Sequence, residues 1–247
     1  MTIKTSNMTK IIIIAKRELQ AYFDSLMAYI LLILFLGFSG FFTWIYGNNI
    51  FFIKQATLMP FFSIAYWTLF FFIPALTMRL ISEENRMGTM ELLLTKPVTI
   101  WQIIMGKYLA SLTLLLVALL LTLPYVVSLS MIGNIDGGQI FSGYFALVLF
   151  SSMMIGIGLF TSSIGQNQIV SYLLALFIGI FFQIIFQMIG QNMFGITGYI
   201  LDYLSTSSHF ESMARGVIDT RDIIFFVGIT FLTLVFTETL LIKRRTA

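Results

Sequence analysis

The chain has 247 residues, of which 58% are hydrophobic and 10% are charged, and its formal net charge is +3. Soluble domains carry about 25% charged residues, so this composition excludes an ordinary soluble enzyme and predicts a polytopic membrane protein. The chain contains no cysteine, which excludes a disulfide framework and a thiolate metal site.

The N-terminal segment 9–25 predicts an amphipathic helix that lies on the membrane surface. Apolar residues recur on one face at helical spacing, at Ile12, Ala15, Leu19, Tyr22, Phe23 and Leu26. Polar residues follow at i, i+4 and i+8 on the other face, at Lys16, Gln20 and Asp24. Such a two-faced helix is typical of an interfacial element that leads into a first span.

Six charge-poor runs each supply the about 20 apolar residues that a membrane-spanning helix needs. We place the spans at residues 26–46, 57–79, 108–132, 140–161, 169–189 and 223–242. A polar interruption at 162–168 divides the long uncharged run 137–201 into the fourth and fifth spans. The sequence therefore predicts an all-α fold with one transmembrane domain over residues 1–247.

The distribution of Lys and Arg predicts the orientation of this bundle. An even number of spans puts both termini on one side, and eleven of the fourteen basic residues fall on that side. They are Lys4, Lys10, Lys16, Arg17, Arg79, Arg86, Lys96, Lys107, Lys243, Arg244 and Arg245. The opposite side has Lys54, Arg215 and Arg221. We therefore expect cytoplasmic termini in a bacterial inner membrane, and the basic residues indicate topology rather than nucleic-acid binding.

Segment 80–106, between the second and third spans, mixes charged with apolar residues and predicts a helical hairpin. Ser82 is expected to cap its first helix, with Glu83 and Glu84 in the first turn, where the helix dipole favours negative charge. An apolar stripe follows at i, i+3 and i+7, and we expect it to pack on the bundle. It consists of Met87, Met90 and Leu94.

Pro97 predicts the end of this first helix, because it lacks a backbone donor and disfavours helical geometry at Lys96. Thr99 and Gln102 have the spacing of a capping box and predict the start of the second helix. The hairpin has two interpretations. It is an interfacial element that lies in the headgroups, or it is a coupling element that docks a soluble partner.

On the opposite side, segment 205–219 predicts a short amphipathic helix on the outer membrane face. Ser208 and Glu211 have capping-box spacing. An apolar stripe follows at Phe210, Met213, Ala214 and Val217. With His209 and Arg215 on the same helix, this element either gates an exit path or caps the bundle structurally.

Few strongly polar or ionisable side chains fall within the spans. Gln183 and Gln187 are spaced i, i+4 on the fifth span, where they either line a substrate path or form an interhelical hydrogen-bond seam. Glu238, one turn from the cytoplasmic end of the sixth span, is the only ionisable candidate within a span, so it is a candidate for ion coupling. Its alternative role is an interfacial carboxylate near Lys243.

The sequence lacks the residues that the tested catalytic motifs need. No segment fits the phosphate-binding pattern G-x-x-x-x-G-K-[ST]. Residues 37–40 resemble the G-x-S-G of intramembrane serine proteases, but the single histidine, His209, falls in the outer segment. No H-E-x-x-H or carboxylate cluster offers a metal site. We therefore expect a protein without a catalytic site, bound cofactor or metal of its own.

The hairpin carries a family resemblance in the runs 81–84, 88–94, 97–98 and 106–107. These residues resemble the cytoplasmic signature of ABC-2 type transporter permeases. That resemblance implies six spans, an N-terminal interfacial helix, and a coupling helix that seats on a separate ATPase holding ATP and Mg²⁺. The coupling residues it implies are Ser82, Glu83, Glu84, Arg86, Gly88, Thr89, Glu91, Lys96 and Pro97.

Three further runs, 91–97, 167–170 and 208–222, resemble gliding-motility-associated permeases of the GldF type. This resemblance implies a GldA-like ATPase, and either a GldG-like second membrane subunit or a second copy of the chain. Permeases of copper-site maturation for nitrous oxide reductase are similar in the outer-helix motif. Three alternatives therefore stay open: another ABC-2 exporter, a mechanical complex that moves no solute, and an ion-coupled carrier using Glu238.

Overall fold

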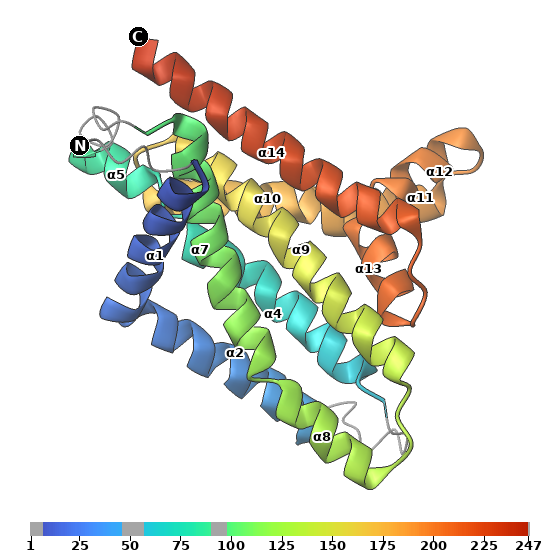
Figure 1. Ribbon diagram of the computed structural model, residues 1–247. Coiled ribbons are helices and arrows are strands. Elements are labelled where there is room, and N and C mark those ends of the chain that lie inside the picture. Colours follow the sequence, from blue (N-terminus) through green and yellow to red (C-terminus); the bar gives the residue numbers. More distant parts are fainter. Residues whose placement is uncertain (1–6, 46–56, 90–97, 247) are drawn as a thin grey trace.

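A computed structural model describes residues 7–45, 57–89 and 98–246, and every regular element in these ranges is a helix (Figure 1). The all-α prediction is therefore confirmed for the described residues. Six helices in these ranges are long and apolar enough to cross a membrane, as predicted. They are Met27–Trp44, Met59–Met87, Ile100–Ile132, Gly137–Ile164, Gln168–Asn192 and Thr220–Arg244.

The chain starts with α1 (Asn7–Asp24), which leads into α2 (Met27–Trp44). Of the predicted apolar face of α1, Tyr22 is buried and Ala15, Leu19 and Phe23 pack against the core, whereas Ile12 is 60% exposed and Leu26 falls beyond the helix. Ile14 is buried instead, and it lies where a side chain on Gly106 would otherwise be. The packed face therefore includes Ile14 and Tyr22, while Ile12 remains free to meet lipid.

The second span is α4 (Met59–Thr77), and a turn joins it to the short α5 (Ser82–Met87). The third span is α7 (Ile100–Leu120), which α8 (Leu123–Ile132) extends. The predicted capping box at the start of α7 is confirmed in both directions: the Thr99 hydroxyl accepts from the Gln102 N–H, and the Gln102 side chain accepts from the Thr99 N–H. The second helix of the hairpin is therefore continuous with the third span.

The remaining helices form the fourth, fifth and sixth spans and the segment between the last two. They are α9 (Gly137–Ile164), α10 (Gln168–Ile180), the π-helix η1 (Phe181–Ile185), α11 (Phe186–Asn192), α12 (Ile196–Tyr203), α13 (Thr206–Ala214) and α14 (Thr220–Thr246). The fifth span thus passes from α to π geometry and back.

Helix α9 is the centre of the bundle. In the apolar 18-residue stretch that would cross the membrane, 67% of the α9 residues are buried, against 22% for the α10–α11 span. Glycines allow its neighbours to approach closely, since a Cβ on Gly158 would lie 1.9 Å from the Thr77 hydroxyl of α4, and one on Gly156 would lie 2.4 Å from the Thr233 hydroxyl of α14. Small residues commonly serve this purpose between membrane helices.

The bundle has two distinct ends. Figure 1 shows α5 at the same end as the start of α1 and the end of α14, which we call the terminal end. The helices α8, α12 and α13 lie at the opposite end, which we call the distal end. There the Thr57 hydroxyl donates to the Gln139 side chain, and the Cα of Gln139 would lie 3.7 Å from a Cβ on Gly216. The starts of the second and fourth spans and the segment before the sixth span therefore converge at the distal end.

Candidate functional site

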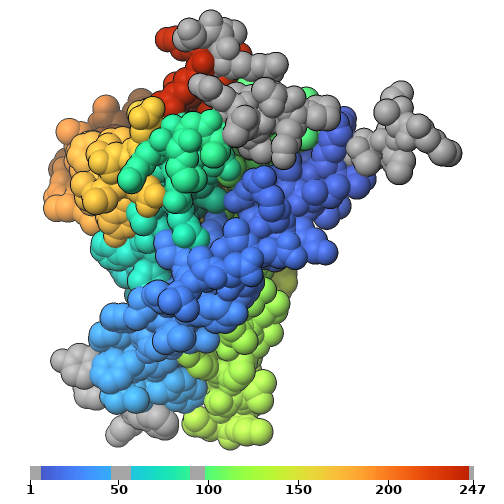
Figure 2. Space-filling model, turned by 90° about the vertical axis from the view of Figure 1, so that its left-hand side faces the viewer, coloured from blue at the N-terminus to red at the C-terminus, as the bar shows by residue number. Residues whose placement is uncertain are grey.

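Helix α5 lies on the surface at the terminal end, between α1 and the start of α10 (Figure 2). It is six residues long and ends at Gly88, whose φ of 67° is left-handed. The Gly88 N–H turns back to the carbonyls of Asn85 and Glu84. Glycine adopts this geometry without steric cost, so it gives α5 a sharp end.

One serine of α9 fixes the start of α5. Ser162 is fully buried, and its hydroxyl accepts from the N–H groups of Ile81 and Ser82, at 3.1 and 3.0 Å. The same hydroxyl donates to the Met78 carbonyl at 2.9 Å. A hydroxyl has one donor and two acceptor sites, so Ser162 uses its full capacity to join α4, α5 and α9.

The predicted capping role of Ser82 is wrong. The N-cap is Ile81, which has no side-chain cap bond, and the buried Ser82 hydroxyl donates to the Met78 carbonyl. The N–H groups that a cap would satisfy are bonded to Ser162 instead, which is 80 positions away from Ser82. Further along α5, the Asn85 side chain donates to the Gly165 carbonyl at 3.4 Å.

A buried charge cluster holds the other side of α5. Lys107 of α7 is 1% exposed, and its Nζ lies 2.8 Å from Glu84 Oε1 and 3.4 Å from Glu18 Oε1. Arg17 pairs with Glu18 and lies 3.8 Å from Glu84. We call these four residues the Lys107 cluster. Two cations thus face two carboxylates, which joins α1, α5 and α7.

The charges within the Lys107 cluster stabilise one another. Burial alone would raise the pKa of Glu18, but the charges of Lys107 and Arg17 outweigh it and hold that pKa below its usual value. Glu84 Oε2 is buried and has no hydrogen-bond partner among the described residues. Removal of either Glu84 or Lys107 would therefore leave the other as a poorly compensated buried charge and destabilise the fold.

The exposed part of α5 and its end consists of Arg86, Met87, Gly88 and Thr89, while Glu83 is half-buried. The expectation that Met87 packs on the bundle is wrong, because this side chain is 61% exposed. The inward side of α5 is occupied by polar groups instead, namely Ser82, Glu84 and Asn85. The other expected residues of the hairpin lie outside the described ranges. They are Met90, Glu91, Leu94, Lys96 and Pro97.

At the distal end, the predicted helix start is wrong by one turn. Ser205 is the N-cap of α13, and its hydroxyl accepts from the Ser208 N–H at 3.4 Å. Ser208 instead donates its hydroxyl to Asp202 Oδ1 at 2.8 Å. Glu211 and Arg215 are exposed, and the Arg215 Nε donates to the Glu211 carbonyl.

His209 is buried and joins α12, α13 and α14. Its Nε2 lies 2.7 Å from the Tyr203 carbonyl, and its Nδ1 lies 2.6 Å from Asp222 Oδ1. A carbonyl can only accept, so Nε2 carries a proton, and the short contact with Asp222 holds a second proton. The His209 ring stacks on Phe225 with a centroid distance of 4.3 Å. Both ring nitrogens of His209 and one ring face are therefore engaged within the chain, which indicates a structural role.

The polar residues of the spans have different surroundings in the structure. Gln183 lies in the π-helix and is 1% exposed, and its amide has no hydrogen-bond partner among the described residues. Its backbone carbonyl accepts from Ser207 at 2.6 Å. Gln187 lines cavities at the distal end. Glu238 is half-buried on α14, and no ion pair joins its carboxylate to another described residue.

Within the described ranges, no group of three or more His, Cys, Asp or Glu side chains could hold a metal ion. The six candidate spans define a multi-pass α-helical membrane protein.

Residues 7–241 match the family described as "ABC-2 family transporter protein", so the chain belongs to the ABC-2 family. Membrane proteins of this family are non-catalytic subunits that pair with an ABC ATPase. None of the curated proteins that were compared is significantly similar to the chain.

Proposed function

We propose that α5 is the surface on which the partner ATPase seats, and that ATP and Mg²⁺ are bound by that partner. The observation that carries this proposal is the two-sided character of α5. Its inward side is bonded to α9 and to the Lys107 cluster, whereas Arg86, Met87, Gly88 and Thr89 are exposed. A force on the exposed residues would therefore reach α4, α7 and α9 directly.

The expected coupling residues then fall into two groups. Arg86, Gly88 and Thr89 contact the ATPase, together with Met87 as an apolar anchor and Glu83 at the edge. Ser82 and Glu84 act from inside, because their side chains bond to the chain itself. Glu91, Lys96 and Pro97 remain proposed contacts on the basis of the family signature. This arrangement requires the terminal end to be cytoplasmic, as the excess of basic residues there supports.

Co-purification with the ATPase tests this surface. The double variant Arg86→Glu with Met87→Asp reverses a charge and removes the apolar anchor, so it should lower the amount of co-purified ATPase at unchanged membrane insertion. Lys16→Glu is the matched control, because Lys16 is exposed on the neighbouring α1. Unchanged co-purification of the double variant would show that the ATPase seats elsewhere.

We further propose that the complex serves gliding motility, with a GldA-like ATPase and a GldG-like membrane subunit or a second copy of the chain. The resemblance of residues 91–97, 167–170 and 208–222 supports this role. In a gliding bacterium that encodes the chain, deletion should abolish gliding. The wild-type gene should restore it, whereas the Arg86→Glu, Met87→Asp gene should not. Normal gliding after deletion would exclude the role while leaving the ATPase-seating surface untouched.

A further inference from the structure

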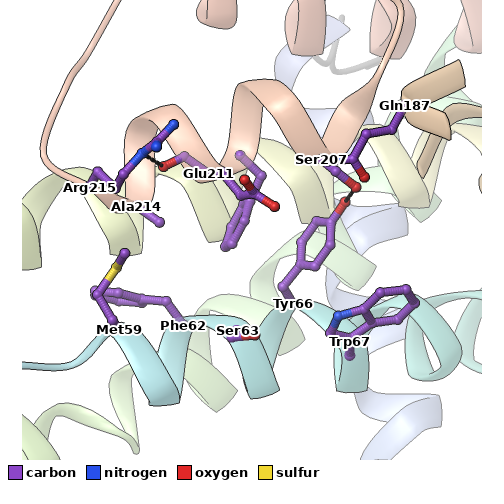
Figure 3. A pocket seen from close by; sticks show the side chains of 11 residues that line it. Met59, Phe62, Ser63, Tyr66, Trp67, Gln187, Ser207, Glu211, Ala214 and Arg215 are labelled. Atoms are coloured by element: carbon purple, nitrogen blue, oxygen red, sulfur yellow. Dashed lines mark hydrogen bonds between the residues drawn. The ribbon is translucent and has the colours of Figure 1, made fainter. Parts of the chain in front are cut away.

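A cavity of about 460 Å³ lies at the distal end between α4 and α13 (Figure 3). Its α4 side is largely apolar, with Met59, Phe62 and Trp67, and Figure 3 shows these side chains beneath α13. Glu211 and Arg215 of α13 line the opposite side. A concave site with an apolar wall and a few polar groups is the usual form of a small-molecule site.

A second cavity, of about 530 Å³, shares the residues Gln187, Glu211 and Arg215 with the first. Its other lining residues are mostly polar and include Asp202 and Ser208. The two cavities therefore share a wall, and the second is a hydrophilic compartment with two carboxylates and one guanidinium.

A third cavity, of about 330 Å³, lies between α2 and α4 and shares Trp67 with the first. Its remaining lining is almost entirely apolar, with Phe38, Phe42, Phe71 and Phe72. Phe38 and Phe71 are about half exposed, so this groove opens to the side of the bundle that faces lipid. The three cavities thus form a series that changes from polar to mixed to apolar.

The charged groups between the first two cavities form no ion pair with the described part of the chain. Glu211 and Arg215 are spaced i, i+4, a spacing at which opposite charges on a helix commonly pair. Here Arg215 Nε instead donates to the Glu211 backbone carbonyl. No ion pair joins either side chain to another described residue. A carboxylate and a guanidinium that are both open to a ligand therefore stand side by side at the polar mouth.

We propose that the three cavities are one binding site for a zwitterionic amphiphile, a lipid whose head carries both a phosphate and an ammonium group. Arg215 would bind the phosphate, since guanidinium and phosphate match in charge and geometry. Glu211 and Asp202 would bind the ammonium group. A hydrocarbon chain would run from the first cavity past Trp67 into the groove of α2 and α4. This site is independent of the ATPase surface, which lies at the other end of the bundle.

Lipid retention by the purified full-length chain in detergent tests the site without any ATPase. Phosphatidylethanolamine and phosphatidylglycerol with identical oleoyl chains are added in equal amounts, and bound lipid is measured by native mass spectrometry. We expect phosphatidylethanolamine to be retained about fivefold over phosphatidylglycerol, the effect of a few partly exposed charge contacts. Equal retention of the two lipids would overturn the proposal.

Two double variants with equal charge changes locate the binding. Glu211→Gln with Arg215→Gln should lower phosphatidylethanolamine retention about fivefold, because both head contacts are lost. Asp219→Asn with Arg221→Gln removes the same charges from the same end at residues that line none of the three cavities. It should retain the lipid as the wild type does. Equal effects of the two double variants would overturn the assignment of the head site.

Two further measurements test the hydrocarbon part. Trp67→Ala should weaken retention of the lipid, whereas Phe141→Ala, at an exposed distal aromatic outside the three cavities, should not. Glycerophosphoethanolamine, which carries the head without chains, should fail to displace the lipid at equal concentration. Displacement by this soluble head, or equal effects of the two aromatic variants, would show that the chain is not bound there.

Discussion

Lys107 Nζ lies 2.8 Å from Glu84 Oε1, and the lysine side chain is almost completely buried, with 1% of its surface exposed. The bond joins the third span to the short helix that we propose as the ATPase seat. Glu18 and Arg17 complete the cluster from α1. An ammonium group at such a buried place requires its carboxylates, because an uncompensated buried charge is expensive. The three helices are therefore expected to move as one unit at the terminal end.

Replacement of Lys107 tests this linkage. Lys107→Met should destabilise the chain by about 3–5 kcal/mol, because it leaves Glu84 and Glu18 without their buried cation. Thermal unfolding of the detergent-solubilised protein measures the loss. The double variant Lys107→Met with Glu84→Gln is the control, and it should be more stable than Lys107→Met alone. If Lys107→Met unfolds at the wild-type temperature, the cluster does not hold the helices together.

The sequence predicts the helices of this protein better than the bonds between them. Composition and uncharged run lengths are enough for six spans, and the local capping box at Thr99 and Gln102 was predicted correctly because its partners are three residues apart. The anchor of α5 was not predicted, since Ser162 is 80 positions from Ser82 and only the packing of α9 brings them together.

Lys107 and Glu18 illustrate the same limit. A lysine at the end of a hydrophobic run usually marks the membrane boundary, and nothing in its local sequence indicates a carboxylate 89 positions earlier. The polar interruption at 162–168 was the available signal for Ser162, because hydroxyl side chains near helix ends often satisfy free backbone groups.

The lowered pKa of Glu18 predicts an acid-sensitive contribution to stability. A glutamate normally titrates at 4.5. Because the folded-state pKa lies below that value, the stabilisation by Glu18 is complete above about pH 4.5 and is lost as pH falls through the lowered pKa. The difference in unfolding temperature between wild type and Glu18→Gln should therefore be constant from pH 7 to about pH 4.5 and shrink on further acidification. A difference that is constant down to pH 3 would contradict this role.

Ser162→Ala should weaken the start of α5. The variant leaves the N–H groups of Ile81 and Ser82 buried without their acceptor, at a cost of about 1–3 kcal/mol. Ser163→Ala is a matched control, because Ser163 is equally buried but donates only to the Phe160 carbonyl of its own helix. Hydrogen exchange at residues 81–84 should increase in Ser162→Ala and remain at wild-type rates in Ser163→Ala. Equal rates in both variants would contradict the anchor.

At the distal end, the variants Asp222→Asn and His209→Ala should differ sharply in stability. In the Asp222→Asn variant a neutral His209 keeps both bonds: Nε2 donates to the Tyr203 carbonyl, and Nδ1 accepts from the new amide. Asp222→Asn should therefore change stability little. His209→Ala should cost about 3–5 kcal/mol, since it removes a buried ring and leaves the Asp222 carboxylate alone. Thermal unfolding compares the two, and equal losses would contradict this proton arrangement.

Close helix packing gives opposite expectations for two glycines. A Cβ on Gly158 would lie 1.9 Å from the Thr77 hydroxyl and 2.7 Å from the Thr77 Cβ. Gly158→Ala should therefore force α4 and α9 apart and cost about 1–3 kcal/mol. A Cβ on Gly37 of α2 would have no atom within 4 Å, so Gly37→Ala should be neutral or stabilise by up to about 1 kcal/mol through helix propensity.

Thermal unfolding of the two glycine variants in the same detergent checks this pair, and activity of the assembled complex gives a second readout. Thr77 is the last residue of α4, directly before the turn at 78–81 that leads to α5, and its hydroxyl donates to the Ile73 carbonyl. Displacement of α4 by Gly158→Ala should therefore disturb the Ser162 anchor and lower coupled ATPase activity, whereas Gly37→Ala should preserve it. If Gly158→Ala matches Gly37→Ala in both measurements, α4 and α9 are not in the close contact on which this linkage depends.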